Sequence, residues 1–212
     1  MAVVVIAAAG VGGWWWATRH TARVAAGTPT SLRAAPATSS TTTTATTQPP
    51  GPGFVAGKVS AVGDSVMIDY QSDLEQQVPG IVVDGSVGRQ WSTGEQLLAQ
   101  QRAAGTLGAV VVVGLSTNGP ITDAMFDAMM STLSGASRVV FVNVHVDQPW
   151  QDPNNAVLAA GVARYKNAVL VDWNALASEH PEWFGPDGTH IAFSGPAPAA
   201  LSKLVADKVA NG

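Results

Sequence analysis

The sequence of 212 residues contains no cysteine. This absence excludes disulfide bonds, thiolate nucleophiles and zinc sites built on cysteine ligands. It leaves the cellular compartment open, because an exported protein can also do without cysteine. Charged residues are also few, at 12%, whereas apolar residues make up 46% of the chain. The composition therefore favours a folded domain with a substantial core over an intrinsically disordered chain.

Basic residues are scarce in the second part of the chain. All 15 acidic residues lie from Asp64 onward, whereas only eight of the 11 Lys and Arg residues follow Phe54, which leaves that region with a net charge of −7. A chain without a basic stripe does not match nucleic-acid binding proteins. Carboxylate pairs with the spacing of a glycosidase and a phosphate-binding glycine loop are also missing. A neutral ester or a sugar polymer is a better match as substrate.

The sequence contains one long apolar run, at residues 2–17, with Trp14-Trp15-Trp16 near its end. Sixteen helical residues span about 24 Å, slightly less than the core of a bilayer. The tryptophans resemble an interfacial belt. We predict a hydrophobic membrane helix with a basic flank over residues 1–26, with a buried core helix as the alternative.

Residues 27–53 are rich in Ser, Thr and Pro and predict a disordered linker. Linkers of this kind commonly hold a domain away from a membrane or wall, so we expect an extracytoplasmic domain on a membrane anchor. The flanking charges argue otherwise, because Arg19, His20 and Arg23 follow the apolar run and favour a cytoplasmic domain by the positive-inside rule. The two observations agree if Met1 is not the biological start and the run is the last span of a longer membrane protein.

Residues 54–212 alternate between short apolar runs and helical patterns, which predicts a parallel sheet with helices on both faces. A capping box at 92–95 opens a predicted helix that ends near Ala104. The other predicted helices are 67–77, 121–133 and 196–210, and the predicted strands are 58–62, 81–84, 108–114, 138–146 and 168–172. Binding sites in such sheets gather at the carboxyl ends of the strands.

A candidate nucleophile lies at the first of these strand ends, in Gly63-Asp64-Ser65-Val66-Met67. A serine between a strand and a helix faces unpaired helix N–H groups that stabilise a developing oxyanion. The alternative is a plain turn in which Asp64 or Ser65 caps the helix. Near the other end of the chain, Asp187-Gly188-Thr189-His190 supplies an imidazole and a carboxylate.

These residues fit serine acyl transfer. Ser65 would attack an ester carbonyl, His190 would take its proton, and Asp187 would hold the imidazole in its working tautomer. The Ser65 and Gly88 N–H groups and the Asn118 side chain are candidates for the oxyanion hole.

The ordered set of motifs resembles the SGNH (GDSL-like) hydrolase superfamily, and more closely the extracytoplasmic C-terminal domain of peptidoglycan O-acetyltransferases and related acyltransferase-3 proteins. The resemblance covers about residues 58–210 and rests on Gly63–Met67, Val87-Gly88-Arg89-Gln90, Thr117-Asn118-Gly119, Trp150 with Asn154 or Asn155, and Asp187–His190. It implies a three-layer α/β/α sandwich with a flavodoxin-like five-stranded sheet, a Ser65–His190–Asp187 triad, and neither metal nor cofactor. It also implies a membrane domain that carries the acyl group and is missing from this sequence, so the acyl donor is expected to be either a separate partner or the missing domain of a longer protein.

The predicted function is O-acyl transfer, with acetyl as the expected group, to hydroxyls of cell-wall or surface polysaccharide. A carbohydrate or lipid esterase is one alternative, and a non-catalytic wall-binding module is another. Arg89 and Trp150 are candidate substrate contacts, with a solvated arginine and a core-covering tryptophan as the alternatives. We expect Asp64 to be structural.

Overall fold

The computed structural model describes residues 49–211. The predicted membrane segment, residues 1–26, and residues 27–48 of the predicted linker lie outside this range. None of the helices between residues 49 and 211 combines the length and the apolar composition that crossing a bilayer requires.

The centre of the domain is a sheet of five parallel strands in the order β2-β1-β3-β4-β5. The predicted parallel sheet is therefore confirmed, and its order is that of flavodoxin-like folds. In this order the chain reverses its direction of winding between β1 and β3, and sheets of this kind bind ligands at the carboxyl ends of the strands at such a point. The strands are β1 (Phe54–Gly63), β2 (Val82–Gly85), β3 (Leu107–Gly114), β4 (Arg138–Val142) and β5 (Ala168–Val171).

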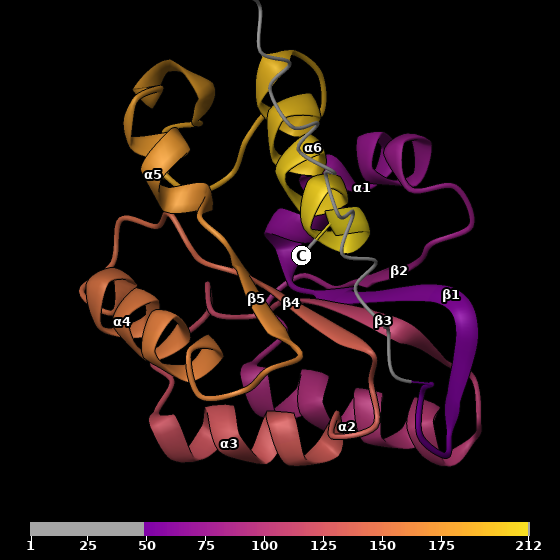
Figure 1. The fold of residues 1–212 in the computed structure, drawn as a ribbon. Helices are drawn as coiled ribbons and strands as arrows, with labels where there is room; N and C mark the ends of the chain where they lie inside the picture. Colours follow the sequence, from indigo (N-terminus) through magenta and orange to yellow (C-terminus); the bar gives the residue numbers. More distant parts are fainter. Residues whose placement is uncertain (1–48, 212) are drawn as a thin grey trace, which may run out of the picture. The chain divides into compact units, whose positions relative to one another are not determined.

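Helices cover both faces of the sheet, which gives the expected three layers (Figure 1). One face packs against α1, α5 and α6, and the other packs against α2, α3 and α4. The helices are α1 (Ser65–Gln77), α2 (Trp91–Ala103), α3 (Asp123–Thr132), α4 (Gln151–Val162), α5 (Trp173–Ser178), the short 3-10 helix η1 (Pro181–Trp183) and α6 (Pro196–Asn211).

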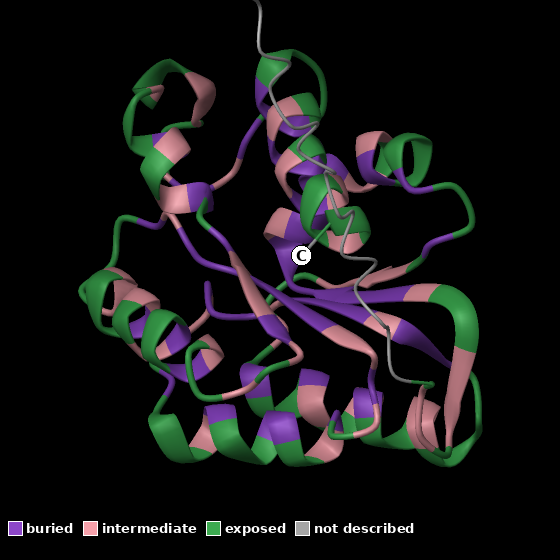
Figure 2. Cartoon of the chain, in the orientation of Figure 1, coloured by how far each residue is buried: buried purple, intermediate pink, exposed green. Residues whose placement is uncertain are grey.

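Strand β3 shows why the middle of the sheet is apolar on both sides. Val111 and Val113 point into the layer of α2 and α3, whereas Val112 points into the layer of α1 and α6. All three are at most 1% exposed. A strand buried on both faces needs a continuous run of β-branched residues, and Figure 2 shows the buried strands between helices whose outer faces are exposed.

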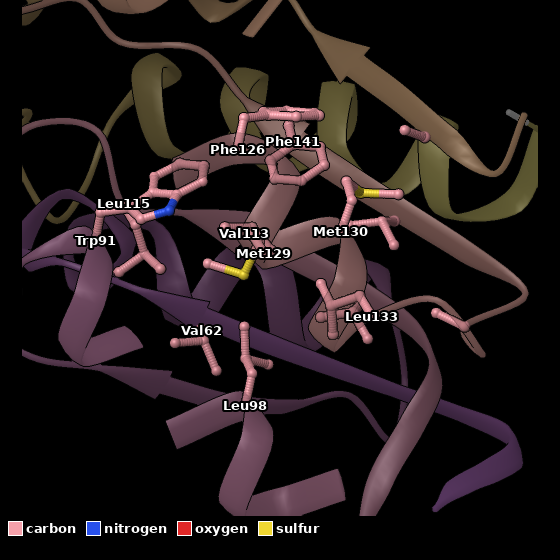
Figure 3. Packing of buried hydrophobic residues seen from close by; sticks show 14 of the residues in the cluster. Val62, Trp91, Leu98, Val113, Leu115, Phe126, Met129, Met130, Leu133 and Phe141 are labelled. Carbon is pink, nitrogen blue, oxygen red and sulfur yellow. The ribbon is translucent and has the colours of Figure 1, made fainter. Parts of the chain in front are cut away.

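Three aromatic side chains pack together in the layer of α2, α3 and α4 (Figure 3). Phe126 and Phe141 lie with ring centroids 4.6 Å apart, and Trp91 stacks on Phe141 at 6.1 Å. The indole N–H of Trp91 donates to the carbonyl of Met125 at 3.2 Å, so its polar atom is satisfied at the edge of the core. This cluster joins α2, α3 and β4.

Several predicted boundaries were wrong for identifiable reasons. Helix α1 begins at Ser65 rather than at residue 67, because Asp64 caps it. The predicted capping box at 92–95 is also wrong, since α2 already begins at Trp91. Strand β4 ends at Val142 rather than at residue 146, because both backbone groups of Val144 bond to the side chain of Asn155, at 2.9 and 2.8 Å. Helices α4 and α5 were not predicted.

Truncation of Phe126 should weaken the fold strongly. We expect Phe126→Ala to lower the free energy of unfolding by about 3–5 kcal/mol, the usual loss for a buried phenylalanine. Urea denaturation followed by circular dichroism measures this change. Phe193→Ala is the matched control, because Phe193 is 72% exposed, and its substitution should change stability by less than about 0.5 kcal/mol. Equal effects of the two substitutions would contradict the assignment of the core.

Candidate active site

Strand β1 delivers Ser65 to the edge of the sheet where β1 and β3 end. Strand β1 ends at Gly63, Asp64 is the helix cap, and Ser65 is the first residue of α1. A side chain at Gly63 would collide with Met67, whose Cβ lies 2.5 Å from the position of an added Cβ. The tight turn therefore requires glycine, and it leaves Ser65, which is 8% exposed, at a helix N-terminus with N–H groups that have no intrahelical acceptor.

Asp64 ties this turn to the neighbouring strand. Its carboxylate accepts the Val66 N–H at 3.1 Å and the Thr117 N–H at 3.3 Å, while its own N–H donates to the carbonyl of Gly114 at 2.9 Å. The side chain is 1% exposed. Burial raises the pKa of Asp64 to about 6, against the opposing effect of hydrogen bonds from Thr117 and Val66. These contacts give Asp64 a structural role.

His190 lies on a loop that is closed by its own backbone. Phe184 and Ile191 form an antiparallel bridge, and the Gly185 N–H donates to the carbonyl of His190 at 2.9 Å. Within the loop, one carboxylate oxygen of Asp187 accepts the N–H groups of Thr189 and His190, both at 3.1 Å. The loop thus fixes Asp187 against His190.

The structure brings Ser65, His190 and Asp187 into one line of hydrogen bonds. Ser65 Oγ lies 2.8 Å from His190 Nε2, and Asp187 Oδ2 lies 2.7 Å from His190 Nδ1. The hydrogen bond from His190, together with those from the backbone, lowers the pKa of Asp187 to about 2. An ionised carboxylate only accepts hydrogen bonds, so Nδ1 carries the proton and Nε2 of the neutral ring accepts the hydroxyl of Ser65.

The same contact makes the imidazole more basic. The hydrogen bond to Asp187 raises the pKa of His190 above its ordinary value; desolvation opposes the rise, and the charges of Asp69, Asp187 and Asp64 add to it. A basic Nε2 in contact with a serine hydroxyl is the arrangement that proton abstraction needs.

Gly88 and Asn118 lie on the loops that follow the strands on either side of β1. Gly88 has a φ of +70° in a turn closed by the bond from the Arg89 N–H to the Ser86 carbonyl at 3.2 Å, a position that favours glycine. The Asn118 amide donates to the carbonyl of Arg89 at 3.4 Å, so it links this loop to the one after β3. Their roles in an oxyanion hole remain predictions.

Arg89 is bonded within the protein, so the alternative of a solvated arginine is wrong, and its contact with substrate remains a prediction. Its guanidinium forms an ion pair with Asp84 at 2.6 Å and donates to the carbonyls of Gly63, at 2.9 Å, and Asp84. Its side chain is only 10% exposed. Arg89 therefore holds the end of β2 against the end of β1.

Two side chains at the start of α4 support the loop after β3. Asn154 is fully buried and accepts the Ile121 N–H at 2.8 Å while it donates to the carbonyls of Ser116 and Gly119, both at 2.9 Å. The indole N–H of Trp150 donates to the carbonyl of Thr117 at 3.0 Å. Trp150 thus braces the loop, and its contact with substrate remains a prediction. Within residues 49–211, no group of three or more His, Asp or Glu side chains is placed to hold a metal ion.

Sequence comparison finds relatives among cell-wall acetyltransferases. The chain is 35% identical over 144 residues to YrhL of Bacillus subtilis, which is named by inference as a peptidoglycan O-acetyltransferase. It is 33% identical over 135 residues to the peptidoglycan O-acetyltransferase OatA of Listeria monocytogenes. These matches cover 68% and 64% of this chain but only 23% and 21% of the relatives. No family model matches the chain.

The fold is that of the C-terminal catalytic domain of OatA from Streptococcus pneumoniae, with a TM-score of 0.65 and 22% identity over 74% of this chain and 92% of that domain. A GDSL-like lipase from Bacteroides thetaiotaomicron matches with a TM-score of 0.54 and 16% identity, over 72% of this chain and 87% of the lipase. The chain is a homologue of peptidoglycan O-acetyltransferases with an SGNH hydrolase fold. The resemblance inferred from the motifs is thereby confirmed, and the two OatA proteins among these matches are named as enzymes.

One polar residue close to Ser65 and His190 escaped the sequence interpretation. Asp69 is 7% exposed and lies four residues after Ser65 on α1. A signal was present, because an acidic residue at i+4 from a candidate nucleophile shares its helix face.

The basicity of His190 can be measured without any substrate. We expect its imidazole to titrate above the ordinary histidine pKa of about 6.5, because Asp187 stabilises the protonated ring. Asp187→Asn should lower this pKa, which NMR of the histidine ring protons would follow. His20→Gln, His145→Gln and His180→Gln would identify the signals of the other three histidines. A His190 pKa that does not fall in Asp187→Asn would contradict the pairing.

Asn154 should matter for stability as well as for the site. We expect Asn154→Ala to lower the free energy of unfolding by about 2–4 kcal/mol, because it leaves buried backbone groups without partners. Gln96→Ala, at an exposed position on α2, is the control and should have little effect in the same urea titration. A small loss for Asn154→Ala would mean that the loop after β3 is held by other contacts.

Proposed function

We propose that this domain is a serine-dependent O-acetyltransferase that acts on hydroxyl groups of cell-wall polysaccharide. The observation that carries the proposal is the contact of 2.8 Å between Ser65 Oγ and His190 Nε2, with Asp187 on the other ring nitrogen. The names of the sequence relatives, which are peptidoglycan O-acetyltransferases, support the choice of group and acceptor.

In the first half of the reaction, His190 Nε2 takes the proton of Ser65 while Oγ attacks the acetyl carbonyl of the donor. The negative charge on the carbonyl oxygen would be held by the N–H groups of Ser65 and Gly88 and by the Asn118 amide. The bond to the leaving group then breaks, the leaving group takes the proton from His190, and an acetyl ester remains on Ser65. Asp187 stays ionised throughout and stabilises the imidazolium.

In the second half, a sugar hydroxyl gives its proton to His190 and attacks the acetyl ester. The bond to Ser65 Oγ breaks, Oγ recovers the proton, and the acetylated sugar leaves. Water in place of the sugar would release acetate by the same steps. Transfer and hydrolysis therefore need the same residues and differ only in the acceptor, so the esterase alternative shares this site.

We also propose that the domain works outside the cytoplasm on a tether formed by residues 1–26, with 27–53 as a stalk. The apolar run and the Ser/Thr/Pro composition support this arrangement. The acetyl group would come from a membrane donor domain, which is either a separate partner or another part of a longer protein. The relatives are more than four times as long as the segment that matches this chain, so they have room for such a donor domain.

The catalytic assignment is tested with a chromogenic acetate ester. Ser65→Ala and His190→Ala should each lower kcat by about 10³-fold or more, because each removes a partner of the proton transfer. Ser72→Ala, on the exposed side of α1, and His180→Ala are matched controls and should retain full activity. Equal activity in wild type and in both site variants would end the enzymatic proposal and favour a wall-binding module.

The acceptor is tested by product analysis with the same ester as donor and a chito-oligosaccharide as acceptor. Mass spectrometry should detect an acetylated oligosaccharide that is absent with Ser65→Ala. Free acetate as the sole product would favour the esterase.

A further inference from the structure

Helix α1 presents two buried polar side chains to the loop that carries His190. Ser65 begins the helix, and Asp69 follows one turn later on the same face. Asp69 is only 7% exposed. Acidic side chains are seldom buried to this extent unless a partner compensates for the lost hydration.

The partner of Asp69 is the backbone immediately after His190. Its Oδ2 atom accepts the N–H of Ile191 at 3.2 Å, and Ile191 is itself 3% exposed. One residue earlier, the ring of His190 meets Ser65 at 2.8 Å. Helix α1 therefore bonds to two consecutive residues of the loop. Ser65 bonds to the side chain of His190, and Asp69 bonds to the backbone of Ile191.

The hydrogen bond between Asp69 and Ile191 differs from the other hydrogen bonds of the loop. The bonds within residues 184–191 described above give the loop its shape and orient Asp187 toward the ring. They join residues of the loop to one another and do not set its position on α1. The contact between Asp69 and Ile191 does, because it fixes the loop to the helix that carries the nucleophile.

Asp69 also contributes charge near the imidazole. Burial raises the pKa of Asp69, and the charge of His190 opposes this rise. In return, Asp69 is one of three carboxylates whose charge raises the pKa of His190; Asp187 lies on the same loop, and Asp64 lies at the start of α1. Asp69 acts from a distance, since its bonded partner is the backbone.

We propose that Asp69 is a positioning residue, which holds the His190 loop in register with Ser65 and stabilises the protonated imidazole. The proposal rests on the acyl-transfer function proposed above. Reacting groups must be aligned closely, and a displacement of about 1 Å can cost about 100-fold in rate. A bond one residue away from the base controls this alignment directly.

Two substitutions separate position from charge. Asp69→Asn keeps an oxygen that can accept the Ile191 N–H but removes the charge, whereas Asp69→Ala removes both. Asp73→Asn, one turn further along α1, is the matched control because it removes an acidic charge that is only partly buried. Circular dichroism would establish that each variant is folded, and kcat, KM and the pH profile would be measured with the chromogenic acetate.

We expect Asp69→Ala to lower kcat by about 10- to 100-fold with little change in KM. Asp69→Asn should recover most of that loss at alkaline pH. The acidic limb of the pH profile of Asp69→Asn should shift to lower pH, because the protonated imidazole of His190 is less stabilised in this variant. The same shift should appear in the NMR titration of His190, which needs no activity and remains informative if Asp69→Ala does not fold.

The outcomes separate this inference from the proposed function. Ser65-dependent activity that is unchanged in both Asp69 variants would overturn the role of Asp69 alone. Equal losses in the two variants with an unchanged His190 titration would also overturn it, because only packing would then be involved. Wild type without Ser65-dependent activity would overturn the proposed function, and the His190 titration in Asp69→Asn would still decide whether Asp69 acts on the imidazole.

Discussion

The site depends on a buried carboxylate at the point where β1 and β3 end side by side. Asp64 bonds to the first turn of α1 and to the backbone of Thr117 after β3, so it joins the two strands at the switch point of the sheet. Burying this group is unfavourable enough to raise its pKa to about 6, yet the bonds it accepts hold Ser65 and the loop of Asn118 in one place. The remaining site residues lie around these contacts of Asp64.

The two sides of the site are held by different means. On the nucleophile side, Arg89 bonds the loop after β2 to the end of β1, and Asn118 bonds it to the loop after β3. The buried Asn154 bonds the loop after β3 to α4. The imidazole side is a surface loop, in which the His190 and Asp187 side chains are 43% and 54% exposed. A surface loop beside a buried scaffold needs an anchor to keep its position, and the contact between Asp69 and Ile191 provides one.

The sequence was sufficient for features that depend on local chemistry. Apolar runs placed all five strands, and the order of motifs placed Ser65, Asp187 and His190 at one edge. Helix α4 was missed because it begins with Gln151-Asp152-Pro153, and Asp-Pro normally indicates a turn; proline is tolerated in a first turn because its missing N–H would lack an intrahelical acceptor anyway. Asp69 was overlooked because its partner, the Ile191 backbone, lies far along the chain. The pairing of Arg89 with Asp84 was not predicted because it depends on the turn after β2.

The exposure of the imidazole bears on how such a site would favour a sugar over water. Solvent reaches His190 and Asp187, so these residues would not exclude water from the proposed acyl-enzyme. A transferase with this geometry has to favour its acceptor by orientation. A bound hydroxyl held against Nε2 reacts as if it were present at very high concentration, whereas water must be oriented anew for each event. Selectivity for transfer would therefore depend on the surface that binds the polysaccharide, while the Ser65–His190 pair supplies the same chemistry to either acceptor.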